Sequence, residues 1–449
     1  MLKKFNFGLI IILILAFALR YKDYASFPVY GETQDEVAWT WLGTGLLQGN
    51  PPTTWSGTNV TGYVIDYDRF FGETKYRIVS PYLDNPYLFS LVPGFFALIK
   101  GFNSIEIPSL AVIRFPMLLI GVVNVWLLSL LVRKLFRPSL GLLAGILYAT
   151  IPTAVFSSRV VVAENTLITI MLAGLLYVSY HPKLSARQAI GLGFLCGLGI
   201  LMKVAGLVIP AALWLYFYWQ KQTRIGWIIL GTALLLGSVY PLYGLLTAPQ
   251  LFMAVMAKQM NLSIGLSGLF HFFIYPQLVQ KTLMDGWMYL GLGSLIYYTV
   301  SHGENRLDLV SAMIFGWLGF LLTATPEVVS HGWYAYPLIP LMIIGLVKAI
   351  DSLKARIGLF PIFSIFVILP LVRLLLLDLN WSVSRLFVKV LFVLVFVPLL
   401  LKIPASHIKY LNLSLMILAI ILNCLVIYHF NRVVYWEDSL HFYPIRSGE

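Results

Sequence analysis

The sequence has 449 residues, of which 59% are hydrophobic and only 11% are charged, and its formal net charge is +12. A soluble domain carries about 25% charged residues, so a soluble fold of this length could not hide so much apolar surface. This composition excludes a soluble protein and predicts an all-α, polytopic integral membrane protein. We expect the excess of Lys and Arg to lie in cytoplasmic loops and not against nucleic acid. Cys196 and Cys424 lie in apolar runs and indicate neither a disulfide framework nor a metal site.

The N-terminal run MLKKFNFGLIIILILAFALR resembles a signal peptide, but no small-residue cleavage site follows it. It is therefore interpreted as an uncleaved first spanning helix with Lys3 and Lys4 in the cytoplasm. A span needs about 20 mostly apolar residues. The hydrophobic runs predict thirteen spans, near 6–20, 110–132, 139–157, 165–180, 186–202, 204–219, 225–244, 286–301, 308–323, 333–350, 357–376, 385–401 and 410–429.

The charges in the loops between these spans predict the orientation. With the N-terminus inside, the cytoplasmic segments hold fifteen Lys and Arg residues but only three acids, Glu304, Asp308 and Asp351. Basic residues concentrate on the cytoplasmic side of membrane proteins. The alternation supports thirteen spans, and an odd number predicts a C-terminus outside.

The first outer loop, about 21–109, is the longest connection and holds nine of the nineteen acids. Loops this long are usually functional or disordered, and the many Trp, Tyr and Phe favour an ordered one. The apolar stretch 85–102 is interrupted by Pro93 and Gly94. If it spanned the membrane, every later loop would change sides, so it is predicted as a juxtamembrane helix at the interface. A second outer loop of moderate size covers about 245–285.

Ionisable residues near helix ends are candidates for function in a membrane protein. Asp35 and Glu36 lie in YGETQDEVAW soon after the first span, where a solvated turn or a helix N-terminus is the structural alternative. Asp84 lies in YLDNPY and could instead be an N-cap.

The remaining candidates lie at outer helix ends further along the chain. Arg159 and Glu164, in SSRVVVAENTL, could form a simple ion pair, although charges are costly near lipid. Lys203, in GILMKVAG, could extend to a lipid phosphate. His331 and Tyr334, in SHGWYAYPLIP, could belong to an interfacial aromatic belt.

Together these residues suggest one site at the outer face in which acids face Arg, Lys and His. Glycosyl transfer from a lipid phosphate needs these groups. A carboxylate can orient the acceptor and take its proton, while the leaving phosphate needs cations and no general acid. Acids from separate loops could also share a hard cation through oxygen ligands.

The order of these motifs resembles the membrane glycosyltransferases of the GT-C superfamily. It is most similar to the branch that contains protein O-mannosyltransferases and lipid A aminoarabinose transferases, classed as family 39-like. The resemblance covers roughly residues 6–350. It rests on LRYKDYASFPVYGETQDE, DNPYLFSLVPGFFALIKGF, IRFPMLLIGVVNVWLLSLLVRKLF, SRVVVAEN, GILMKVAGLVIP and HGWYAYPLIPLM.

The resemblance implies a GT-C fold and a polyprenyl-phosphate sugar as donor. It implies that Asp35, with Glu36 beside it, acts as the base or orients the acceptor, and that Asp84 is the second acid of the loop. Arg159 and Glu164 match a turn whose acids help to hold a metal in related oligosaccharyltransferases, so a divalent ion at Glu164 is left open.

For the substrate-binding residues, Lys203 matches a lysine that follows the fifth helix, and His331 and Tyr334 match a polar-aromatic position before the tenth. The family often has Asp-Lys-Pro-Pro where this chain has Asp84 followed by Asn85. A phosphate contact from the missing lysine must then come from another base. The candidates are Lys203, Arg77 and Arg159.

These observations predict a prokaryotic inner-membrane glycosyltransferase that moves a sugar to a lipid, glycan or protein acceptor outside the cytoplasm. The partners would be the lipid-linked donor, the acceptor and membrane lipids, with no nucleic acid. The rival function is a transporter or flippase of lipid-linked sugars, which should show inverted repeats and charges at mid-membrane. An inactive relative that only binds lipid is a third alternative.

Overall fold

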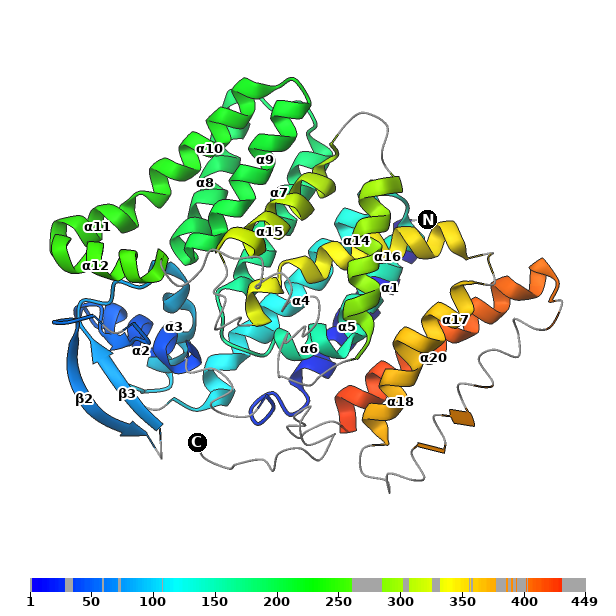
Figure 1. Cartoon of the computed structure of the whole chain (residues 1–449), viewed down its shortest axis with the longest axis horizontal. Helices are drawn as coiled ribbons and strands as arrows, with labels where there is room; N and C mark the ends of the chain where they lie inside the picture. Colours follow the sequence, from blue (N-terminus) through cyan, green and yellow to red (C-terminus); the bar gives the residue numbers. More distant parts are fainter. Residues whose placement is uncertain are drawn as a thin grey trace.

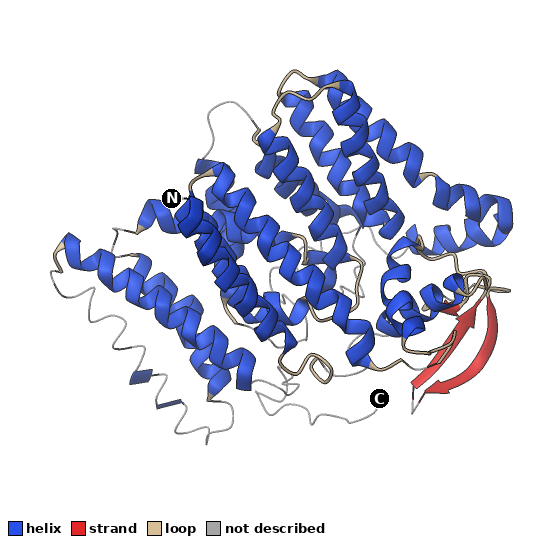
Figure 2. Cartoon of the chain, turned by 180° about the vertical axis from the view of Figure 1, so that it is seen from behind, coloured by secondary structure: helices blue, strands red, loops and turns tan. Residues whose placement is uncertain are grey.

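Helices make up most of the computed structural model (Figures 1 and 2). It describes residues 2–28, 35–58, 60–71, 74–106, 108–260, 285–301, 307–324, 332–354, 358–376 and 403–429, with a few single positions between the last three ranges. The helical membrane architecture expected from the composition is confirmed.

The helices of the N-terminal half coincide with the predicted spans. The span predicted at 139–157 is broken by Pro152, because a proline cannot donate to the preceding turn. The helices are α1 (Leu2–Tyr21), α4 (Leu110–Leu135), α5 (Pro138–Thr150), α6 (Pro152–Ser157), α7 (Glu164–Tyr180), α8 (Ala186–Met202), α9 (Val208–Trp219, after the 3-10 turn η2, Val204–Leu207), α10 (Thr223–Gly237) and α11 (Val239–Thr247).

The C-terminal half follows the same pattern, except that most of the span predicted at 385–401 lies outside the described residues. The span predicted at 357–376 is interrupted by a π-helical turn. The elements are α14 (Trp287–Ser301), α15 (Leu309–Ala324), η3 (Gly332–Ala335), α16 (Leu338–Leu353), α17 (Leu359–Phe363), η4 (Ser364–Ile368), α18 (Leu369–Leu375) and α20 (Ala405–His429).

Three of the described helical segments are long and apolar enough to cross a membrane by themselves. They are Leu110–Leu135, Thr223–Thr247 and Ser406–His429. The other apolar helices are shorter, and some of them continue one another across a break, as α5 and α6 do. Interrupted helices are tolerated at membrane depth where neighbouring helices bury the break.

The first outer loop folds as a layer on one end of the helix bundle (Figure 1). Its helices are α2 (Asp35–Leu47), η1 (Leu88–Ser90) and α3 (Leu91–Ile99). A small antiparallel sheet, which the sequence analysis did not predict, has the order β1-β3-β2. Its strands are β1 (Thr54–Trp55), β2 (Val64–Phe71) and β3 (Thr74–Val79). The helix α12 (Pro249–Met260) of the second outer loop lies at the same end.

The stretch predicted as a juxtamembrane helix forms α3, which packs tightly on α2. A Cβ atom added to Gly94 would lie 2.4 Å from the carbonyl carbon of Gly43, so the two backbones touch where both side chains are absent. At 1.5 Å per residue, the nine residues of α3 extend about 14 Å, whereas the hydrocarbon core is about 30 Å thick. α3 is therefore too short to cross the bilayer.

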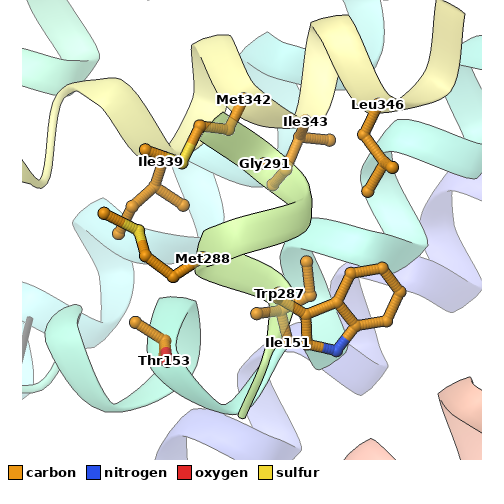
Figure 3. Close-up of a pocket in the computed structure, with 9 residues that line it drawn as sticks. All are labelled: Ile151, Thr153, Trp287, Met288, Gly291, Ile339, Met342, Ile343 and Leu346. Carbon is orange, nitrogen blue, oxygen red and sulfur yellow. The ribbon is translucent and has the colours of Figure 1, made fainter. Parts of the chain in front are cut away.

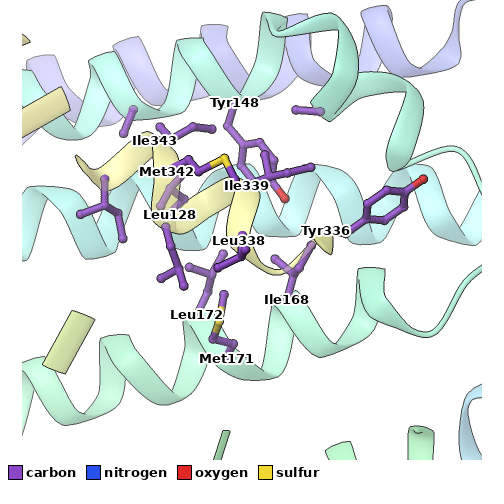
Figure 4. Close-up of a cluster of buried hydrophobic side chains, with 14 of the residues drawn as sticks. Leu128, Tyr148, Ile168, Met171, Leu172, Tyr336, Leu338, Ile339, Met342 and Ile343 are labelled. Carbon is purple, nitrogen blue, oxygen red and sulfur yellow. The ribbon is translucent and has the colours of Figure 1, made fainter. Parts of the chain in front are cut away.

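The main core lies among α4, α5, α7 and α16 (Figure 4). Leu128, Tyr148, Met171 and Met342 come from these four helices and are almost fully buried. The indole N–H of Trp317 on α15 donates to the sulfur of Met171 at 3.2 Å. At this level the described part of the bundle is filled by apolar side chains.

A small void lies between α5, α6, α14 and α16 (Figure 3). It measures about 20 Å³ and is lined almost entirely by apolar side chains, among them Trp287, Met342 and Leu346. About 10–15 Å³ is needed for one water molecule. This void can hold nothing as large as a sugar, and we treat it as a packing defect.

The bundle has two distinct ends, which we name from the direction of the helices. The outer end carries α2, α3 and the sheet, and α7 begins there while α8 ends there. The inner end is opposite and holds the C-terminus of α4 and the N-terminus of α8. α20 runs from the inner end, where Asn412 donates to the carbonyls of Lys354 and Arg356, to the outer end, where Lys22 lies 5.0 Å from the ring of Tyr428.

Candidate active site

Four of the residues singled out in the sequence come together at the outer end. Asp35 begins α2, Glu164 begins α7, Lys203 directly follows α8, and Tyr334 lies in η3. We call these four residues the outer polar cluster. They come from segments far apart in the chain, so only the fold brings them into one place.

The centre of the cluster is a buried ion pair. The ammonium group of Lys203 lies 2.6 Å from Oε1 of Glu164, and the same nitrogen lies 4.9 Å from the centre of the Tyr334 ring. Glu164 is fully buried and Lys203 is 8% exposed. The second carboxylate oxygen of Glu164 has no hydrogen-bond partner among the described residues, although it is buried. An acceptor atom in this state can receive a hydrogen bond from a substrate hydroxyl.

Asp35 is the acid of the cluster nearest to solvent and is half-buried. Burial raises the pKa of its carboxyl group above the ordinary value, the positive charge of Lys203 opposes this, and the negative charge of Glu36 adds to it. Glu164 and Tyr334 are also within electrostatic range of Asp35. A carboxyl group with a raised pKa is a stronger base than one in water, as a proton acceptor requires.

Glu36 points away from the cluster and forms a buried pair with Arg114 of α4. Its two oxygens accept from Nε and Nη2 of Arg114 at 2.8 and 2.7 Å, and both side chains are almost fully buried. Oε1 also accepts from the backbone N–H of Val161 at 3.1 Å, and Arg114 donates to the carbonyls of Tyr24 and Pro28. This pair therefore fixes the start of α2 against α4 and against the turn before Glu164.

Arg159 also holds the backbone in place and does not point into the cluster as a free cation. Its guanidinium donates to the carbonyls of Leu19, Arg20 and Phe27, at 2.8 to 3.2 Å. These are carbonyls at and after the end of α1, which would otherwise have no partner in a helix terminus. Arg159 thus caps α1 and holds the chain that leads to α2. Lys203, which belongs to the outer polar cluster, is the better placed cation for a phosphate.

Asp84 lies beside the cluster in a cage of hydroxyl groups. Its carboxylate accepts from Ser56, from Thr58 at 3.1 Å and from Tyr63 at 2.8 Å. Burial raises the pKa of Asp84, and these hydrogen bonds oppose the shift. Gln259 of α12 donates to Thr58, so this cage joins the two outer loops. His331 lies outside the described residues, and its predicted role remains a prediction.

Sequence reasoning missed Arg114 and Arg20 as organising residues, and it also missed Asp285. Both arginines are fully buried, and the other charged residues of their helices lie at the opposite helix ends. Asp285 is buried and accepts from the backbone N–H groups of Thr153 and Trp287, at 2.8 and 3.1 Å, which ties α6 to α14. A lone arginine inside a predicted span is a recognisable signal, because a charge there requires a partner.

Among the described residues, Glu164 does not belong to a set of metal ligands. No group of three His, Cys, Asp or Glu side chains in the described part of the chain is arranged to hold a metal. Hard cations take six or more oxygen ligands. The ammonium group of Lys203 already provides the positive charge beside Glu164. The predicted metal role of Glu164 therefore finds no support in this geometry.

An apolar cavity of about 330 Å³ lies at the same end of the bundle, and its lining residue Tyr240 is within electrostatic range of Asp84. Its walls come from α2, from η1 and α3, from the end of α8 and from α11, and they include Tyr87, Leu201 and Tyr243. Leu201 is two residues before Lys203, and Tyr87 is three residues after Asp84. Leu242 and Leu246 of α11 are exposed nearby, at 52% and 84%, on a helix expected to face lipid.

Comparison with solved structures identifies the architecture. The chain resembles ArnT from Cupriavidus metallidurans bound to undecaprenyl phosphate, with 15% identity over 95% of this chain and 77% of that chain and a TM-score of 0.57. The apo form of that protein gives 14% identity, 88% and 70% coverage and a TM-score of 0.53. The apo oligosaccharyltransferase of Archaeoglobus fulgidus gives 13% identity and a TM-score of 0.50. At these identities the likeness shows the fold, and it is the fold that the sequence motifs predicted.

Within that class, residues 84–244 match the family model described as dolichyl-phosphate-mannose-protein mannosyltransferase. A search of curated protein sequences gave no match. The likeness to the oligosaccharyltransferase covers 97% of this chain but only 57% of that protein, so the chain spans little more than half of its length.

Proposed function

We propose that the chain is a glycosyltransferase that moves a sugar from a polyprenyl-phosphate donor to an acceptor at the outer end of the bundle. The observation that carries this proposal is the cluster of Asp35, Glu164, Lys203 and Tyr334, with an apolar cavity at the same end of the bundle. The match to a family named for dolichyl-phosphate-mannose and the likeness to a protein crystallised with undecaprenyl phosphate support the choice of donor.

The chemistry follows from the charges of the cluster. Asp35 accepts the proton of the acceptor hydroxyl or amine while the acceptor atom bonds to the anomeric carbon of the sugar. The bond from that carbon to the phosphate oxygen breaks, and its electron pair leaves with the phosphate. Attack from the side opposite the phosphate inverts the anomeric centre. Lys203 stabilises the negative charge that grows on the phosphate.

Other residues of the site hold the catalytic groups in position. Glu36 and Arg114 hold the start of α2, so that Asp35 keeps its direction. Arg159 holds the chain after α1, and Asp84 holds Thr58 and Tyr63 of the first outer loop in place. Oε2 of Glu164 accepts a hydrogen bond from a hydroxyl group of the donor sugar. The ring of Tyr334 lies against the ammonium group of Lys203. His331 remains a candidate substrate-binding residue.

The apolar cavity suits the isoprenoid part of a lipid-linked substrate. Its walls are apolar and its volume is within the usual range for small-molecule pockets, about 300–1,000 Å³. A transporter would need charges along a path at mid-membrane. In the described bundle the cluster lies at one end, and the core between α4, α5, α7 and α16 is apolar. This arrangement favours an enzyme over a transporter.

The proposed location is a prokaryotic plasma membrane with the outer end facing away from the cytoplasm. A reporter enzyme fused after Glu449 should then be active only outside. The proposed activity is tested with the purified full chain in lipid, offered a panel of polyprenyl-phosphate hexoses and pentoses together with lipid, glycan and peptide acceptors. Acceptor-dependent release of polyprenyl phosphate supports the proposal, whereas no release with any donor, from monodisperse protein, contradicts it.

A further inference from the structure

The turn between α6 and α7 connects two parts of the proposed site. Its residues 158–163 are not helical, and all of them are buried. One of its backbone N–H groups donates to Oε1 of Glu36, the residue after Asp35, at 3.1 Å. The turn ends at Glu164, which pairs with Lys203. It is therefore a physical connection between the proposed base and the proposed cation.

Asn165, the second residue of α7, holds this turn in shape. A buried turn needs partners for its backbone groups, because neither water nor a regular helix provides them. The side-chain nitrogen of Asn165, which is 2% exposed, donates to the carbonyl of Ser157 at 3.0 Å and to that of Val160 at 2.9 Å. Ser157 ends α6, so one amide group joins the end of α6, the turn and the start of α7. An amide nitrogen has two N–H groups for this purpose, which neither a carboxylate nor a hydroxyl offers.

A second asparagine holds Asn165 from the neighbouring helix α4. The side-chain nitrogen of Asn124 donates to the backbone carbonyl of Asn165 at 3.0 Å, and its side-chain oxygen accepts from the hydroxyl of Thr169 at 2.7 Å. Hydrogen bonds between helices help them to associate in membranes, and this accounts for Asn124. The bonds from the Asn165 side chain fix the turn itself, which helix association does not require.

We propose that Asn165 is a positioning residue that sets the distance between Asp35 and Lys203. This inference rests on the proposed function, in which Asp35 takes the proton of the acceptor and Lys203 stabilises the leaving phosphate. Asn165 acts through Glu164 and through the bond from the turn to Glu36, without touching a substrate. The base and the cation work on opposite sides of one sugar carbon, so their spacing must match the reacting groups. A misplacement of about 1 Å can lower a rate by about 10²-fold.

The first test compares two asparagines that make the same kind of contact. Asn165→Leu removes both hydrogen bonds and keeps a side chain of similar size. The matched control is Asn412→Leu at the inner end, because the side-chain nitrogen of Asn412 also donates to two backbone carbonyls, those of Lys354 and Arg356, at 3.0 and 3.2 Å. Both variants should have a lower thermal unfolding midpoint.

The kinetics of the full chain in lipid separate positioning from stability. We expect kcat per folded molecule to fall by about 10-fold or more in Asn165→Leu, while polyprenyl phosphate still binds, and to stay at the wild-type value in Asn412→Leu. If Asn165→Leu does not fold, Asn165→Ser, which keeps one hydroxyl donor, must show the loss of kcat. A wild-type kcat in the folded Asn165 variant, or an equal loss in both asparagine variants, would overturn the proposal.

A second measurement does not depend on sugar transfer. Spin labels are attached at Leu47→Cys on α2 and at Val204→Cys, directly after Lys203, since both positions are exposed. Cys424→Ser removes a half-buried native thiol, and the other cysteine is fully buried. The distance between the labels is measured by double electron–electron resonance on the full chain in lipid.

The distance distribution decides whether the spacing depends on Asn165. We expect it to be broader or shifted in Asn165→Leu, or in Asn165→Ser if the first variant does not fold, and unchanged in Asn412→Leu. An unchanged distribution in the Asn165 variant overturns the inference. A changed distribution in a chain whose wild type transfers no sugar would support the positioning of the two groups by Asn165 and contradict the proposed function alone.

Discussion

Lys203 and Glu164 form a buried ion pair with 2.6 Å between nitrogen and oxygen, although 39 positions separate them in the chain. The pair joins the outer end of α8 to the outer start of α7 and leaves one oxygen of Glu164 without a partner among the described residues. A cation held in this way is already in place when a phosphate arrives. Such preorganisation is the main source of electrostatic stabilisation in enzymes.

Replacing Lys203 tests whether this cation serves the donor phosphate. Lys203→Met should lower kcat/KM for the lipid-linked donor by about 10²-fold or more, the scale for loss of one group that stabilises transition-state charge. Lys203→Arg should retain part of the rate. The control is Lys100→Met, an exposed lysine after α3 at the same end. Wild-type kcat/KM in Lys203→Met, measured by release of polyprenyl phosphate, would show that the phosphate lies elsewhere.

Removal of divalent metals should leave the transfer rate unchanged. The reason is that the ammonium group of Lys203, 2.6 Å from Oε1 of Glu164, already provides a positive charge at this place. The measurement is transfer activity after extensive treatment with a chelator, with and without added Mg²⁺, Mn²⁺ or Zn²⁺. A rate that disappears with the chelator and returns with one metal contradicts this account of the cluster.

The pair of Glu36 and Arg114 should contribute to folding more than to proton transfer. Glu36→Gln leaves the buried Arg114 guanidinium without its counter-charge, which costs about 3–5 kcal/mol for a pair of this kind. We expect a clearly lower thermal unfolding midpoint. Combining Glu36→Gln with Arg114→Met should recover part of the loss, because the unpaired charge is removed. An unfolding midpoint in Glu36→Gln equal to that of wild type would contradict this structural role.

The pH dependence of transfer should report the ionisation of Asp35. Burial raises its pKa above the ordinary value of about 3.9, and only the ionised form can take a proton. Activity should therefore fall as the pH is lowered, and the midpoint of this acidic limb of the pH profile should lie above the ordinary pKa of an Asp side chain. Asp84→Asn should keep this limb, whereas the residual activity of Asp35→Asn should lack it. The same limb in Asp35→Asn would assign the ionisation to another group.

Much of the fold could be predicted because apolar runs of about 20 residues have few alternatives in a membrane. The outer loop was harder to predict. Its sheet is formed by the segment VIDYDRFFGETKYRIV, where aromatic and charged residues mix and no clean alternation separates two faces. The position of α3 on α2 depends on a close backbone contact between Gly43 and Gly94, which sequence spacing does not reveal.

Part of the candidate site could be singled out from the sequence for a similar reason. Asp35, Glu164 and Lys203 could be singled out because each is a charge at the end of an apolar helix. The partners of Glu36 and Arg159 could not be predicted. Glu36 pairs with Arg114, 78 positions further along the chain, and Arg159 donates to backbone carbonyls more than 130 positions away. The sequence predicted a catalytic role for Glu36 and a substrate-binding role for Arg159, whereas their contacts support a role in positioning.

The most direct test of the proposed function is the rate of sugar transfer by Asp35→Asn and Glu36→Gln, compared with wild type, on detergent-solubilised proteins of equal monodispersity. Asp35→Asn keeps the shape of the side chain and removes the base. We predict that its rate of polyprenyl phosphate release is lower by about 10²-fold or more, the usual scale for a positioned base. Binding of the lipid donor should be retained. Glu36→Gln should lose activity in proportion to its loss of folded protein. Transfer by Asp35→Asn at the wild-type rate would contradict the assignment of Asp35 and, if Glu36→Gln were inactive while still folded, would move the base to Glu36.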